Sequence, residues 1–138
     1  MAVEQTLILA KPDAVGRGLA GEIVARFERR GFSLRAARLL RVDRPLAEQH
    51  YAEHEAKPFF GELVEFITSG STLAFVLEGE GVIATARKTI GATNPADAEA
   101  GSLRGDFASS MPDNLVHGSD SPESAEREIA LWFPDGLV

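Results

Sequence analysis

The sequence contains no cysteine among its 138 residues. A disulfide framework and a zinc site built on thiolates are therefore excluded. Long apolar runs are also missing, since no stretch of this sequence approaches the ~20 residues of a membrane-spanning helix. The first five residues lack the basic segment of a secretory signal peptide. We therefore expect a protein of a reducing, cytoplasmic compartment with no membrane span.

Lysine is scarce, because Lys11, Lys57 and Lys88 are the only three, and the formal net charge is −7. Nucleic-acid binding needs a basic face that displaces counterions, so this charge argues against a general nucleic-acid partner. An acidic protein that binds an anion has to gather its few cations in one place. The acid excess fits a salty habitat and fits a well-solvated surface equally well.

The rest of the composition is that of one folded domain. At 14.8 kDa and 44% hydrophobic residues, the chain can bury a proper core. The sequence shows no linker, internal repeat or low-complexity block. We therefore expect a single domain over residues 1–138.

Apolar periodicity and turn residues predict alternating strands and helices. We expect strands over residues 6–10, 32–42, 72–78 and 114–117, and helices over 19–30, 43–54, 60–69, 82–90 and from 121 onward. A loss of phase at Ala36 and Ala37 predicts a β-bulge. Residues 91–113 are polar, with a length typical of functional or disordered loops. This order is an elaborated βαββαβ pattern, which predicts a ferredoxin-like α+β sandwich with an antiparallel four-stranded sheet, additional helices, and the helices on one face.

A histidine lies just before the last helix, in the segment NLVHGSDS of residues 114–121. Ser121 is expected to cap this helix and Pro122 to occupy its first position. Projection at 100° per residue places Glu128 at the border of the apolar face, which consists of Ala125, Ile129, Trp132 and Phe133. A carboxylate there can accept a hydrogen bond from one nitrogen of His117 and leave the other nitrogen free for attack. The alternative is a histidine in an ordinary turn.

Six motifs follow one another along the chain: KPDAV (11–15), YAEH (51–54), KPFF (57–60), GATNP (91–95), RGDF (104–107) and NLVHGSD (114–120). In these motifs, and in Glu128 eleven residues after His117, the chain resembles the nucleoside diphosphate kinases from about Glu4 to Phe133. The resemblance implies the same ferredoxin-like fold. It also implies transfer of the terminal phosphoryl group from a nucleoside triphosphate to a nucleoside diphosphate, by a ping-pong mechanism through a phosphohistidine.

The resemblance assigns catalytic roles to five residues. It implies that His117 is the nucleophile through Nδ1, that Glu128 orients its other nitrogen, and that Ser119 supports the pair. Tyr51 and Lys11 are expected near the transferred group.

The resemblance also implies a nucleotide-binding set: Lys11, Phe59, Leu63, Arg87, Thr93, Arg104, Met111 and Asn114. Arg87, Thr93 and Arg104 are expected to hold phosphate oxygens. Lys11 and Asn114 are expected to bind the ribose hydroxyls. The apolar members are expected to clamp the base, although Phe59 and Leu63 also suit a core at helical spacing.

The expected cofactor is Mg²⁺ carried by the nucleotide, because this ion prefers phosphate oxygens and waters to a protein cage. No metal site on the protein itself is expected. The resemblance implies a homo-oligomer, for which we favour a hexamer over a dimer or tetramer. The chain ends at Val138, soon after its last helix, so we expect it to lack the longer tail that braces neighbours in some members.

Two other functions remain open at this point. Residues 50–54, HYAEH, match the H-x-x-E-H pattern of inverzincins, which would make this a zinc peptidase with a third ligand on a second helix. A ferredoxin-like domain could also bind a nucleotide without turnover. A Walker A loop is excluded, since residues 16–21, GRGLAG, lack the Lys-Ser/Thr ending.

Overall fold

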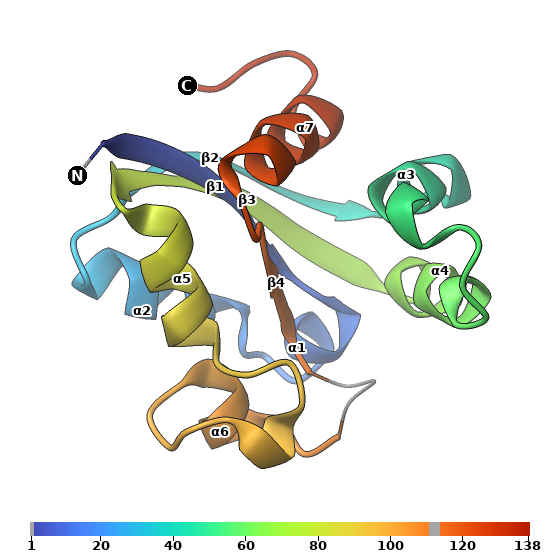
Figure 1. Ribbon diagram of the computed structural model, residues 1–138, viewed down its shortest axis with the longest axis horizontal. Helices are drawn as coiled ribbons and strands as arrows, with labels where there is room; N and C mark the ends of the chain where they lie inside the picture. Colours follow the sequence, from blue (N-terminus) through green and yellow to red (C-terminus); the bar gives the residue numbers. More distant parts are fainter. Residues whose placement is uncertain (1, 111–113) are drawn as a thin grey trace.

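The computed structural model describes residues 2–110 and 114–138, so Met111, expected at the base clamp, lies outside the described residues. Its sheet contains β1 (Val3–Ala10), β2 (Ser33–Arg41), β3 (Ser71–Glu80) and β4 (Val116–Gly118). The strand order is β2-β3-β1-β4, and all three pairings are antiparallel (Figure 1). The predicted ferredoxin-like α+β fold with four antiparallel strands is therefore confirmed.

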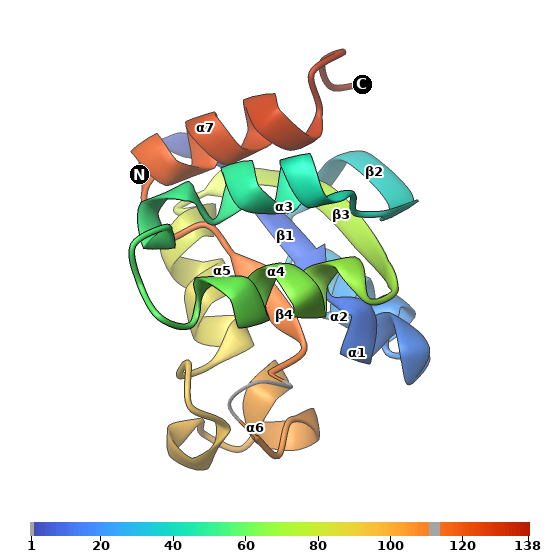
Figure 2. The same cartoon turned by 90° about the vertical axis from the view of Figure 1, so that its right-hand side faces the viewer.

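The helices of the described residues are α1 (Pro12–Gly16), α2 (Ala20–Arg29), α3 (Arg44–His50), α4 (Phe60–Thr68), α5 (Val82–Ile90), α6 (Leu103–Phe107) and α7 (Pro122–Trp132), with 3-10 turns at Ala52–His54 and Pro95–Asp97. The expectation of helices on one face is wrong. Helices α2 and α5 cover one face of the sheet, while α3, α4 and α7 lie on the other (Figures 1 and 2).

The central strand β1 explains this two-sided cover. Ile8 and Ala10 belong to one buried cluster, whereas Leu7 and Leu9 belong to the other. Successive side chains of a strand point to opposite faces, so a continuous apolar run requires helices on both sides. The apolar run Leu7–Ala10 therefore indicates that the sheet is covered by an apolar layer on each face.

Several features differ from the sequence prediction: for example, β1 begins at Val3 rather than at residue 6, and the short helix α1 was not predicted. The helix expected over residues 43–54 ends at His50, because the backbone then tightens into a 3-10 turn. The segment expected to be a loop contains α6, whose start is capped by the Ser102 hydroxyl accepting from Gly105 N at 3.0 Å. The β-bulge is found between Leu34 and Ala36, one residue earlier than expected. Short helices and bulges leave too little periodicity for a sequence pattern to locate them.

The last helix begins as predicted. The Ser121 hydroxyl accepts a hydrogen bond from Ser124 N at 3.1 Å, and Pro122 occupies the first helical position. Helix α7 packs along β1, so its inner face reaches the strand that pairs with β4. None of the described helices is long and apolar enough to cross a membrane.

Candidate active site

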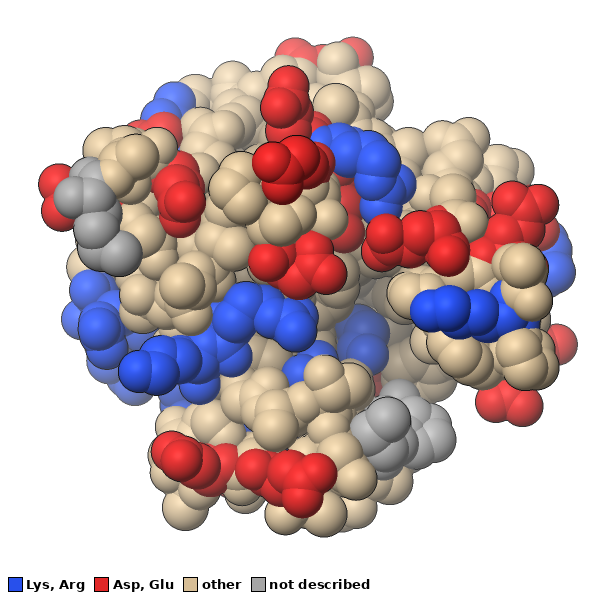
Figure 3. Space-filling model, viewed as in Figure 1, with Lys and Arg blue, Asp and Glu red and all other residues tan. Residues whose placement is uncertain are grey.

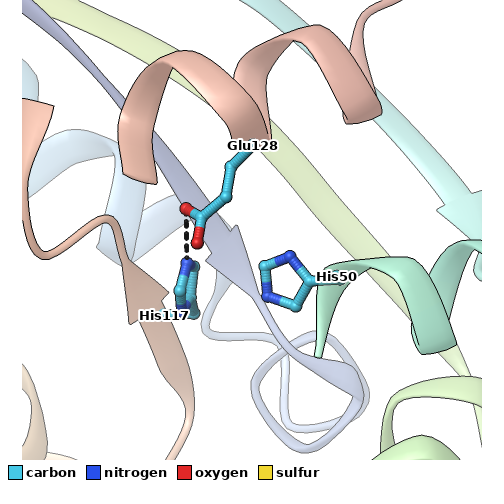
Figure 4. A group of neighbouring side chains, drawn as sticks. All are labelled: His50, His117 and Glu128. Atoms are coloured by element: carbon cyan, nitrogen blue, oxygen red, sulfur yellow. Dashed lines mark hydrogen bonds and ion pairs between the residues drawn. The ribbon is translucent and has the colours of Figure 1, made fainter. Parts of the chain in front are cut away.

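His117 lies on the short strand β4, where it pairs with Leu9 of β1. Its side chain keeps 24% of its surface exposed, and its Nε2 lies 3.0 Å from Oε1 of Glu128 on α7 (Figure 4). A carboxylate at that distance favours the tautomer in which Nε2 carries the proton. The lone pair of His117 then resides on Nδ1.

Glu128 is more deeply buried than its border position in the sequence suggested, with 4% of its surface exposed. The Ser119 hydroxyl donates to Glu128 Oε1 at 2.7 Å and in turn accepts from Leu7 N at 3.2 Å. Burial alone would raise the pKa of Glu128, but the hydrogen bond and charge of His117 and the hydrogen bond of Ser119 together lower it. The carboxylate is therefore ionised and fixed by the sheet.

A second hydrogen-bonded chain runs from the end of β1. The buried Lys11 ammonium donates to Oδ1 of Asn114, and Asn114 Nδ2 donates to the Thr93 carbonyl at 3.3 Å. Leu115, next to Asn114, has a φ of 73°, a conformation that costs a non-glycine residue free energy. Its N–H donates to the Asp13 carboxylate at 3.0 Å, which holds the backbone in that conformation.

Arg104 supports the backbone that carries His117. Its guanidinium donates to the carbonyls of Asn114 (3.1 Å), Gly91 (3.1 Å) and Val116 (2.6 Å). Burial, followed by the charge of Arg87, lowers the pKa of Arg104 to about 10, which still leaves it protonated at neutral pH. Arg87 donates to the Gly118 carbonyl at 3.1 Å.

A groove of about 720 Å³ adjoins this region, between α5 and the segment before α6. Arg30, Arg87, Lys88 and Thr93 are among the residues that line it. Figure 3 shows Lys and Arg side chains gathered between α5 and α6, with acidic side chains on the surfaces beside them. Several cations of this acidic chain thus gather beside the groove.

The apolar candidates lie on the neighbouring helices. Phe59 is 43% exposed, so it is not a core residue, and the Lys57 ammonium lies 5.6 Å from its ring centre. Leu63, one turn further along α4, is half-buried. Burial, followed by the charge of Glu128, raises the pKa of Tyr51 to about 12. Tyr51 therefore keeps its phenolic proton.

His50 enters the site, although the sequence had suggested it only as a zinc ligand. Its ring centre lies 4.7 Å from that of His117, and Trp132 Nε1 donates to His50 Nδ1 at 3.0 Å. Sequence reasoning missed the hydrogen bond between His50 and Trp132 because it joins α3 to α7, which lie far apart in the sequence. The sequence offered only one hint of it, namely the presence of His50, His117 and Trp132 as ring side chains that could pack together.

His50, His117 and Glu128 form the one group in the described part of the chain that could hold a metal ion, with candidate ligand atoms within 4.8 Å of one another. However, Trp132 donates to the lone pair of His50 Nδ1, so a neutral His50 carries its proton on Nε2 and offers no ligand atom there. The zinc-peptidase pattern also fails, because His54 lies in the 3-10 turn rather than on α3 with His50.

The chain matches the family model described as nucleoside diphosphate kinase over residues 4–138. It is 60% identical over 136 residues to nucleoside diphosphate kinase 1 of Spinacia oleracea, covering 99% of this chain and 92% of that protein. It is also 60% identical over 131 residues to a nucleoside diphosphate kinase of Brevibacillus brevis, covering 95% of this chain and 89% of that protein.

Solved structures agree with the sequence comparisons. A halophilic nucleoside diphosphate kinase from Halobacterium salinarum, in complex with CDP, superposes with a TM-score of 0.95 at 47% identity, covering 99% of this chain and 92% of that one. A nucleoside diphosphate kinase family protein from Babesia bovis has a TM-score of 0.95 at 46% identity, covering 98% of this chain and 92% of that one.

Proposed function

This chain belongs to the nucleoside diphosphate kinase family, and from that premise we propose that His117 is the residue that carries the phosphoryl group. The chain is an enzyme that transfers the terminal phosphoryl group of a nucleoside triphosphate to a nucleoside diphosphate, by a ping-pong reaction through a phosphohistidine. The observation that carries the assignment is the 3.0 Å contact of His117 Nε2 with Glu128. The zinc-peptidase and non-catalytic alternatives have no support.

In the first half-reaction, His117 Nδ1 attacks the terminal phosphorus in line with the leaving nucleoside diphosphate. A P–N bond forms as the P–O bond breaks, and the electron pair leaves with the diphosphate oxygen. Positive charge develops on the imidazole, and the Glu128 carboxylate stabilises it through Nε2–H. The second half-reaction reverses these steps with another diphosphate as acceptor.

The remaining candidates form the proposed nucleotide site. Arg87, Thr93 and Arg104 are proposed to hold phosphate oxygens, a role supported for Arg87 and Thr93 by their place in the lining of the groove. Lys11 and Asn114 are proposed to bind the ribose, as discussed below. The exposed ring of Phe59 suits contact with a base, with Leu63 and Met111 as the other apolar contacts, and Tyr51 is proposed to lie near the transferred group.

The family requires a divalent cation, and we propose that Mg²⁺ serves on the nucleotide rather than in a protein cage. Calorimetric titration of the nucleotide-free protein with Mg²⁺ should give no saturable heat, whereas titration in the presence of ADP should. Saturable binding to the protein alone would contradict this proposal.

The family assembles into oligomers, and for this chain we propose a hexamer of single-domain protomers in the cytoplasm. Light scattering under assay conditions should give about six times the 14.8 kDa protomer mass. A mass of two or four protomers would show that the assembly is a dimer or tetramer rather than a hexamer. A mass of one protomer would refute assembly.

A nucleoside diphosphate exchange assay tests the activity itself. With ATP as donor and GDP as acceptor, double-reciprocal plots of the rate of GTP formation at several fixed GDP concentrations should give parallel lines, as the ping-pong reaction requires. Intersecting lines would show that both nucleotides bind before transfer, and the phosphohistidine mechanism would then be wrong.

Replacing Glu128 with glutamine should lower kcat/KM by about 10- to 100-fold, the range for partners that orient a catalytic imidazole. The amide keeps the shape but loses the charge that stabilises the developing imidazolium. The matched control is Glu126→Gln, an exposed carboxylate on the same helix, which should keep the wild-type rate. Equal rates for the two variants would show that Glu128 has only a structural role.

A further inference from the structure

His50 is a buried histidine beside the nucleophile that the reaction described above does not use. It is the last residue of α3, and 4% of its surface is exposed. The planes of the His50 and His117 rings meet at 79°, in a T-shaped arrangement with centres 4.7 Å apart. Figure 4 shows the edge of His50 turned toward the face of His117, with one ring nitrogen on that edge.

Helix α7 fixes both imidazoles from one surface. Glu128 contacts His117 Nε2 at 3.0 Å, and Trp132, four residues later, donates to His50 Nδ1 at 3.0 Å. Residues four apart lie one above the other on a helix, so these two anchors project side by side. Trp132 is fully buried, and its ring centre lies 5.4 Å from that of His50, which leaves the His50 ring little room to turn.

His50 is uncharged in this setting. Burial, followed by the neighbouring charge of His117, lowers the pKa of His50 to about 3 against the opposing effect of Glu128. Arg127 and Lys11 also act to lower it. A neutral ring adds no cation beside the nucleophile and forms no ion pair with the Glu128 carboxylate.

We propose that His50 is a positioning residue, whose ring edge, locked by Trp132, holds the His117 imidazole in the orientation that directs Nδ1 toward the phosphorus. Glu128 fixes one nitrogen of His117 but leaves the ring free to rock about that contact. The edge of His50 against the ring face removes this freedom. The proposal rests on the proposed role of His117 as nucleophile.

Two substitutions separate the ring from the hydrogen bond. His50→Gln keeps an acceptor for Trp132 but removes the ring, whereas His50→Phe keeps a ring edge but removes the acceptor. If the ring positions His117, the maximal rate of phosphoenzyme formation with saturating ATP should fall about tenfold or more in His50→Gln, since small misplacements of a reacting group cost this much or more. His50→Phe should restore most of that rate, and the KM for ATP should stay within about twofold in both variants.

The control for loss of stability is Phe27→Leu, a core change in the cluster on the opposite face of the sheet. It should lower the Tm without changing the rate of phosphoenzyme formation. A wild-type rate in His50→Gln, a loss no greater than that of Phe27→Leu, or a change confined to KM would overturn the proposal. So would a loss in His50→Phe equal to that in His50→Gln.

If His50→Gln does not fold, Trp132→Phe takes its place. It leaves His50 without its anchoring donor, so the phosphorylation rate should fall about threefold or more at unchanged KM. A wild-type rate in Trp132→Phe would then reject the proposal. His117→Ala in the same assay keeps the two proposals apart, because wild-type labelling of that variant would refute the nucleophile, whatever His50→Gln does.

Discussion

Replacing His117 with alanine is expected to abolish phosphotransfer almost entirely. The variant lacks the nitrogen that forms the P–N bond, and no other nucleophile of the described site shares its position between β4 and α7. Incubation of wild type with ATP labelled in the γ-phosphate should give an acid-labile, base-stable phosphoprotein. The alanine variant should give none, and its exchange rate should fall to the background.

A histidine outside the proposed catalytic group provides the control. His54 lies in the 3-10 turn after α3, and His54→Ala should still become labelled. Label on His117→Ala at the wild-type level would show that the nucleophile is another residue. A folded state identical to wild type, by circular dichroism and Tm, is required of both variants.

Removing the 3′-hydroxyl from the acceptor is expected to lower catalytic efficiency by about 1.5–3 kcal/mol, roughly 12- to 160-fold. Lys11 and Asn114 are buried and hydrogen-bonded to each other, and together they offer a donor and an acceptor to a sugar hydroxyl. A nucleoside diphosphate without that hydroxyl loses the charge-assisted contacts that position its sugar. Phe59 offers a base only a π face, so purines and pyrimidines should serve alike.

The measurement uses the isolated phosphoenzyme, so that only the acceptor varies. Dephosphorylation rates with ADP, GDP, CDP and TDP are compared with one another, and ADP is compared with 3′-deoxy-ADP. The difference among the four bases should be smaller than the penalty for the missing hydroxyl. The opposite order would mean that unidentified residues contact the base edges and that the proposed sugar contacts are wrong.

Local signals in the sequence were sufficient for most of the elements. Helix α5 was predicted with the observed bounds, and α7 begins with the expected cap at Ser121 and proline at the first position. These features depend on residues within one or two turns of each other, so a sequence pattern contains the whole interaction. The motif around His117, with Glu128 eleven residues later, likewise located the candidate centre.

The tertiary structure decided what depends on contacts between distant segments. The sequence predicted helices on one face, although the continuous apolar run of β1 needed two layers. It placed Glu128 at a helix border, whereas the packing of α7 on β1 buries it and the Ser119 hydroxyl compensates for that burial. Burying a carboxylate costs free energy unless hydrogen-bond donors surround it, and for Glu128 the fold supplies these donors.

His50 shows the same limit most clearly. Its sequence neighbours suggested a zinc motif, but its hydrogen-bond partner Trp132 lies 82 residues away. The sequence by itself determined which elements form and which side chains are candidates for the chemistry, because residue type and local spacing fix what a side chain can do. Only the fold decided which side chains meet, because the tautomer of an imidazole and the charge of a buried group depend on neighbours that chain order does not reveal.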